Sequence, residues 1–136
     1  MGLDIRLPMK PGEQLPPKYF VSLDDDGYYW FMHPQFETLK EKTGQYLDLY
    51  GGATFAGESL SVLKETVTAI REQVINMPER WEVHTGDLIG SHLHPTPPQP
   101  IFKTVEKETF LDLLDRLDEV VDAAVRTGTP IVALGD

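Results

Sequence analysis

One stretch of aromatic and β-branched residues, positions 18–32, constrains the fold of this chain more than any other. Its sequence, KYFVSLDDDGYYWFM, holds two apolar runs separated by three aspartates and a glycine. Because an Asp-Gly pair favours the positive φ angles of a tight turn, this spacing predicts a β-hairpin. The second run has no polar break, which indicates that both faces of its strand are covered. We therefore expect this hairpin inside a sheet.

Periodic patterns predict further elements around the hairpin. Apolar residues recur at helical intervals over 59–76 and 105–127, and a shorter helix is expected over 34–43. The predicted strands cover residues 3–7, 45–50, 81–85 and 130–134, with 54–56 as an alternative edge strand within an expected loop at 53–57. Together these elements predict an α+β fold, in which a mixed or antiparallel sheet is packed by three helices.

Two proline-rich stretches interrupt this pattern. Residues 8–17 contain four prolines and predict an extended connector, because proline lacks the backbone donor that a central strand needs. Residues 86–103 contain four prolines, two glycines and two histidines, and predict a long irregular loop. Such loops in compact domains are usually functional or disordered. We expect a single domain over 1–136, with the loop at 86–103 as its candidate functional segment.

The charge balance narrows the classes of partner. The chain has 22 acidic and 12 basic residues, a formal net charge of −10. Such a field repels nucleic-acid phosphates and steers a basic protein towards the surface, although it also serves solubility. The sequence contains no apolar window long enough for a membrane span, and the absence of cysteine fits a reducing compartment. We expect a cytoplasmic protein that binds neither nucleic acid nor membrane.

Three histidines form the one candidate metal site. His92 and His94 would project to the same side of an extended segment, and His84 lies at the end of a predicted strand. This spacing can offer nitrogen ligands to zinc, with Asp87 as a further ligand and Glu82 as a nearby base. Histidines in a proline-rich loop are more often solvated. We therefore expect no cofactor, and zinc is the alternative that these histidines leave open.

Aromatic residues admit two interpretations. Tyr28, Trp30 and Trp81 would form an interaction surface for a protein if their strands were half exposed. If the strands are internal, the same residues belong to the core, with each polar tip bonded at the rim. The size of the chain favours the core interpretation, because a small domain needs this bulk.

Three hypotheses on function follow. The sequence contains no G-x-S-x-G elbow, dinucleotide fingerprint or P-loop. The leading hypothesis is therefore a small acidic protein-binding module, such as an immunity-type or inhibitory protein that neutralises a basic partner. A metal-dependent enzyme using His84, His92 and His94 is the first alternative. A non-catalytic homo-oligomer, paired through the loop or an edge strand, is the second.

Overall fold

The computed structural model describes residues 2–8, 12, 19–90, 93 and 97–136. This part of the chain contains three helices and six strands in two antiparallel sheets, which confirms the α+β fold. The elements are β1 (Gly2–Arg6), β2 (Phe20–Asp24), α1 (Gly27–Thr43), β3 (Gly52–Phe55), α2 (Glu58–Ile75), β4 (Arg80–Leu88), β5 (Gln99–Glu106), α3 (Lys107–Thr127) and β6 (Ile131–Gly135).

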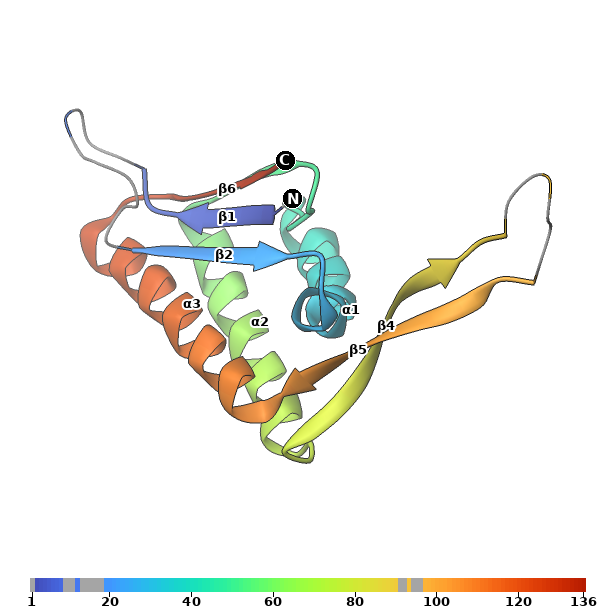
Figure 1. Cartoon of the computed structure of the whole chain (residues 1–136). Coiled ribbons are helices and arrows are strands. Elements are labelled where there is room, and N and C mark those ends of the chain that lie inside the picture. Colours follow the sequence, from blue (N-terminus) through green and yellow to red (C-terminus); the bar gives the residue numbers. More distant parts are fainter. Residues whose placement is uncertain (1, 9–11, 13–18, 91–92, 94–96) are drawn as a thin grey trace.

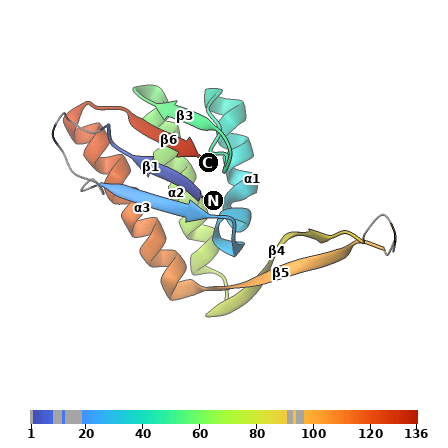
Figure 2. The same ribbon diagram turned by 45° about the horizontal axis from the view of Figure 1, so that its top comes forward.

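A four-stranded sheet with the order β2-β1-β6-β3 forms one layer, and the helices pack beneath it (Figures 1 and 2). Residues alternate between the two faces, so that Leu3 and Ile5 are buried while Asp4 and Arg6 are partly exposed. Ile5 pairs with Val21 on one side and Ala133 on the other. The predicted strands 3–7 and 130–134 are confirmed as the two central strands, and the core lies between the sheet and the helices.

The predicted hairpin over 18–32 is wrong in its second half. Its first run forms β2, but helix α1 begins at Gly27. Asp26 caps this helix, since its Oδ1 accepts hydrogen bonds from the backbone N–H groups of Tyr28 (2.9 Å) and Tyr29 (3.2 Å). The Asp-Gly pair thus starts a helix instead of turning between strands. The predicted helix 34–43 is the C-terminal part of α1, and Pro34 lies inside it.

The predicted strand at 45–50 is also wrong. Leu47 and Leu49 are buried as their alternation indicates, but this segment pairs with no strand. The edge strand is instead β3, which largely coincides with the alternative at 54–56. The side chain of Gln45 accepts a hydrogen bond from the backbone N–H of Thr54 (2.9 Å), so the segment caps the outer edge of the sheet.

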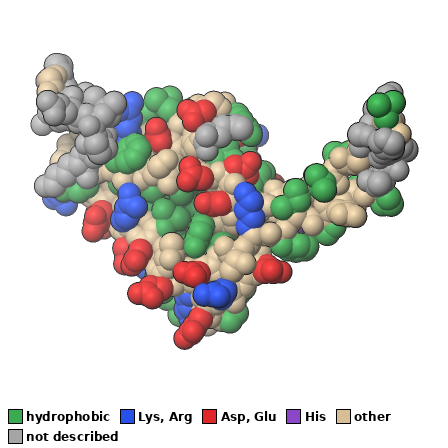
Figure 3. All heavy atoms as spheres, viewed as in Figure 1, with side chains coloured by type: hydrophobic (Ala, Val, Ile, Leu, Met, Phe, Trp, Pro, Cys, Tyr) green, Lys and Arg blue, Asp and Glu red, His purple; other side chains and the backbone are tan. Residues whose placement is uncertain are grey.

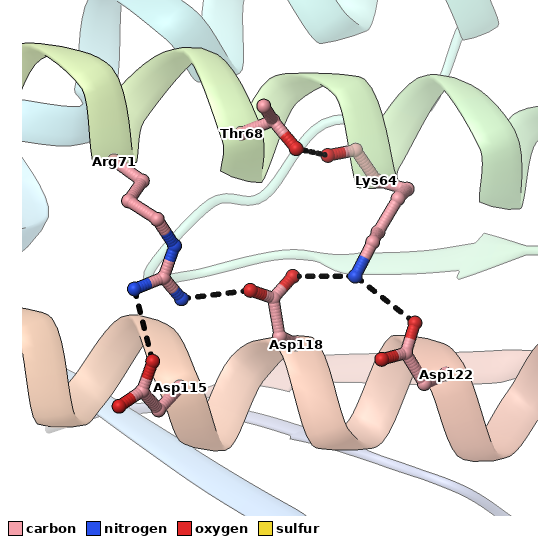
Figure 4. Close-up of polar contacts among 6 residues, drawn as sticks. All are labelled: Lys64, Thr68, Arg71, Asp115, Asp118 and Asp122. Atoms are coloured by element: carbon pink, nitrogen blue, oxygen red, sulfur yellow. Dashed lines mark hydrogen bonds and ion pairs between the residues drawn. The ribbon is translucent and has the colours of Figure 1, made fainter.

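The two longest predicted helices are confirmed as α2 and α3. They lie side by side and are joined by a row of ion pairs (Figure 4). Asp118 accepts from Lys64 Nζ (2.9 Å) and from Arg71 Nη2 (2.7 Å). Asp115 and Asp122 extend the row at its two ends. These pairs fix the mutual position of the two helices on the side away from their apolar stripes.

Candidate functional site

The second sheet is a two-stranded ribbon, β4 and β5, which projects from the body (Figures 1 and 2). The predicted strand 81–85 is confirmed within β4. The predicted irregular loop at 86–103 is wrong in its outer parts, because β4 continues to Leu88 and β5 begins at Gln99. The register shifts between His84 and Gly86, which makes Thr85 a β-bulge. Beyond the bulge, Gly86 pairs with Ile101 and Leu88 with Gln99, so the ribbon continues away from the core.

The root of the ribbon is fixed to the body by one of its faces. Val83 and Val105 are buried, and Val105 pairs with Trp81 across the ribbon. The Trp81 ring stacks on Phe110 of α3, with ring centroids 6.0 Å apart. Lys103 Nζ donates to the backbone carbonyl of Asp25 (3.1 Å), just before α1. The ribbon is thus a rigidly rooted arm.

The projecting half of the ribbon is apolar. Of the nine large hydrophobic side chains that are exposed in the described residues, five lie between positions 88 and 102. They are Leu88, Ile89, Leu93, Ile101 and Phe102, with exposed fractions between 39% and 83%. Figure 3 shows hydrophobic and uncharged side chains along the projecting part in this view, whereas acidic side chains are spread over the body. Concentrated apolar exposure is common at interaction sites, whereas single exposed apolar residues are ordinary, so this segment is the candidate site.

The aromatic residues predicted as an interaction surface lie at the root of the ribbon, each partly buried. Tyr28 contacts Phe110 edge to face at 5.2 Å, and its hydroxyl accepts a hydrogen bond from the backbone N–H of Glu106. Trp30 Nε1 donates to the Asp25 carboxylate (2.6 Å). Trp81 Nε1 is buried and has no hydrogen-bond partner within the described part of the chain. Tyr28 and Trp81 thus join the root of the ribbon to the body, whereas Trp30 contacts residues of α1 and the segment before it.

The predicted metal ligands do not form a described site. His84 is exposed on β4, with its Nε2 2.9 Å from Asp87 Oδ1 and its ring 5.5 Å from that of Phe102. His92 and His94 lie outside the described residues. Among the residues that the structure does describe, no group of three or more histidines, cysteines and carboxylates could hold a metal ion. Of the candidate zinc ligands, the structure therefore places only His84 and Asp87 next to each other.

One polar chain in the body resembles a catalytic relay in its connectivity. Tyr46 is hydrogen-bonded to His33 Nε2 (2.5 Å), and His33 Nδ1 lies 3.1 Å from Glu37. A nucleophilic or basic phenolate needs a lowered pKa. Burial instead raises the pKa of the Tyr46 phenol, so this residue stays a neutral hydrogen-bonding group. Burial also raises the pKa of Tyr29, whose hydroxyl donates to the Leu47 carbonyl. We assign this chain a structural role.

A hollow of about 630 Å³ opens at the root of the ribbon, where β4 and β5 meet the start of α3. Its lining residues are Glu79, Arg80, Glu106, Lys107, Glu108 and Leu111. Arg80 forms an ion pair with Glu106 (3.1 Å), and Lys107 Nζ donates to the carbonyls of Ile75 and Met77. Three carboxylates (Glu79, Glu106 and Glu108) and two cations (Arg80 and Lys107) line the hollow, so it carries a small net negative charge.

The sequence singled out residues 86–103 as a candidate functional segment, but predicted an irregular loop where the structure has a ribbon. Two short apolar runs flank the histidine- and proline-rich tip, and that symmetry is the signal of a long hairpin. Prolines 97, 98 and 100 argued against a strand there, yet proline is tolerated at the edge of a ribbon. Ile101 and Phe102 therefore escaped notice as exposed anchors.

Comparison of the chain with protein-family models, with curated proteins and with solved structures gives no significant match. Across the described residues, no helix combines the length and apolar character that crossing a membrane requires.

Proposed function

We propose that this chain is an acidic protein-binding module that neutralises a basic protein partner, in the manner of an immunity-type inhibitor, and that the ribbon formed by β4 and β5 makes the main contact. The observation that carries the proposal is the projecting position of the ribbon together with the five exposed apolar side chains between positions 88 and 102. Apolar and aromatic anchors that become desolvated supply most of the binding energy in protein interfaces.

The charge of the chain supports a basic partner. The net charge is −10, and exposed carboxylates surround the root of the ribbon at Asp25, Glu79, Glu82 and Glu108. An apolar arm that rises from an acidic surface combines electrostatic steering with a hydrophobic anchor. Opposite charge accelerates association and selects the partner, while the apolar contacts set the rate of dissociation.

A second copy of the chain is a less suitable partner, because two bodies of charge −10 repel each other. Catalysis receives less support than binding. In the tyrosine–histidine–glutamate chain described above, burial raises the pKa of Tyr46, which disfavours its phenolate, and Tyr46 and His33 bond to each other within the body.

Photo-crosslinking from the ribbon tests the proposal. A photoreactive amino acid is placed at Leu88 or Phe102, and as a control at Tyr50, an exposed aromatic residue of the body. We expect the ribbon positions to capture one basic protein in the native host, and Tyr50 not to capture it. That protein is then purified, and its affinity for the chain is measured over a range of salt concentrations.

Two results would support the proposal in the purified pair: direct binding that weakens as ionic strength rises, and loss of the partner's activity on binding. Crosslinks between copies of the chain, with a dimer seen by light scattering, would establish the homo-oligomer instead. A captured partner that carries net negative charge would also contradict the proposal.

A further inference from the structure

The two faces of the ribbon differ in what they contact. Trp81, Val83 and Val105 point towards the helices, so the residues between them in β4 and β5 point away. The register pairs these outward residues in three rows, Arg80 with Glu106, Glu82 with Thr104, and His84 with Phe102. All six are exposed. We call them the outer face of the ribbon.

The outer face is acidic at its root and aromatic at its far end. At the root, Arg80 is paired with Glu106. Glu82 is exposed, lies opposite Thr104, and forms no ion pair within the described residues. At the far end, Phe102 is 52% exposed and contacts the His84 ring. A ligand that follows this face meets carboxylates first and an aromatic ring second.

The hollow at the root continues this surface into the body. It shares Arg80 and Glu106 with the outer face, and it adds the carboxylates of Glu79 and Glu108 and the apolar side chain of Leu111. Lys107 also lines the hollow, but its Nζ is held by the carbonyls of Ile75 and Met77. The outer face and the hollow therefore form one continuous strip.

We propose that this strip binds an extended basic segment of the partner protein, with an apolar side chain on Phe102 and a lysine or arginine beside Glu82 and in the hollow. The inference rests on the proposed function and specifies which face of the ribbon is used. Side chains on one side of an extended chain recur every ~6.7 Å, which is also the distance between successive outward rows of a ribbon. An extended segment can thus match each row with one side chain.

Charge favours this occupant over the alternatives. A second copy would bring its own Glu82, Glu106 and Glu108 against the same groups. Nucleic-acid phosphates would meet carboxylates at the root of the strip and in the hollow. Lysine and arginine side chains supply both an apolar stem for Leu111 and a cationic head for the surrounding carboxylates.

Peptide binding to the full chain tests the inference. The probe is a synthetic peptide in which lysine and threonine alternate around one central leucine, and its counterpart has glutamine at every lysine position. Four variants are compared with the unchanged protein by isothermal titration calorimetry. Glu82→Lys and Phe102→Ser alter the strip. Glu65→Lys, an exposed charge reversal on α2, and Tyr50→Ser, an exposed aromatic truncation, are the matched controls.

We expect the lysine peptide to bind at least ~10-fold more tightly than the glutamine peptide. Phe102→Ser should weaken binding ~10-fold or more, as loss of a central aromatic anchor does, and Glu82→Lys about 5-fold or more. The controls should stay within about twofold. Because Glu65→Lys changes the net charge as much as Glu82→Lys does, equal losses in the two would overturn the inference.

The failure of the inference can be told apart from that of the proposed function. If Ile101→Ser, on the opposite face of the ribbon, weakens peptide binding more than Phe102→Ser, the outer face is not the site. Lack of lysine-peptide binding also overturns the inference. In either case crosslinks from the ribbon to a basic partner would leave the proposed function standing, and their absence would remove both.

Discussion

Gly27, the first residue of helix α1, lies directly against Val105 of the ribbon, so that a Cβ atom at position 27 would be 2.6 Å from Cγ1 of Val105. The backbone carbonyl of Lys103 would lie 3.2 Å away. Glycine at position 27 therefore permits close packing of α1 against the ribbon. The second half of the aromatic segment 18–32 starts at this contact.

Gly27→Ala should lower the free energy of unfolding by about 1–2 kcal/mol, because the added methyl group meets a stiff, buried valine and a backbone oxygen. Urea denaturation measures the change. Gly86→Ala is the matched control, since nothing lies within 4 Å of a Cβ atom there, and we expect its effect to be within about 0.5 kcal/mol. Equal effects of the two substitutions would contradict close packing at Gly27.

The free energy of unfolding should depend on pH through Asp26. Burial raises its pKa above the ordinary 3.8, even though the N–H groups of Tyr29 and Tyr28 oppose the shift. Because its pKa is higher in the folded than in the unfolded state, protonated Asp26 is favoured by folding. The protein therefore has its full stability from this group below the unfolded-state pKa, and loses it as the pH rises through the folded-state pKa.

Asp26→Asn retains an oxygen that can cap the helix and carries no charge. The free energy of unfolding of this variant, measured relative to the unchanged protein, should therefore increase as pH rises from below 3.8 through the raised pKa. Asp26→Ala lacks the capping oxygen and should cost about 1 kcal/mol. A difference between the Asn variant and the unchanged protein that is independent of pH would argue against the raised pKa.

Asp118 should contribute more to stability than its neighbour Asp122. The Asp118 side chain is 23% exposed and binds both Lys64 and Arg71, whereas that of Asp122 is 59% exposed and binds Lys64 alone. Asp118→Asn should cost about 1 kcal/mol and Asp122→Asn less than about 0.5 kcal/mol. Thermal unfolding in low and high salt measures both, and we expect salt to reduce the smaller effect first.

Side chains at the root of the ribbon should contribute to the free energy of unfolding, whereas those of its projecting half should not. Val105→Ala removes buried contacts and should lower the free energy of unfolding by about 2 kcal/mol. Phe102→Ser removes an exposed side chain and should change it by less than about 0.5 kcal/mol. If Phe102→Ser destabilised the fold as strongly as Val105→Ala, Phe102 would be part of the core and not an anchor for a partner.

The sequence by itself determined the elements in which a buried apolar face repeats over many residues, and the short strands in which apolar residues form a distinct run. The apolar stripes of α2 and α3 and the short runs of β1 and β6 were all predicted, because one buried face repeats along each. The loop of interest was also located from its proline and histidine content, although His92 and His94 lie outside the described residues.

Only the tertiary structure decided how the ambiguous segments are used. An Asp-Gly pair followed by four aromatic residues is compatible with a hairpin as far as local sequence goes. The helix that begins at Gly27 instead places Tyr29, Met32, Phe36 and Leu39 together in the core. Likewise, the sequence does not distinguish which apolar residues of β4 and β5 are buried. In the structure, α1 and α3 cover Val83 and Val105, whereas Phe102 is exposed. Local sequence sets which backbone conformations are favourable, whereas burial depends on contacts between residues far apart in the chain.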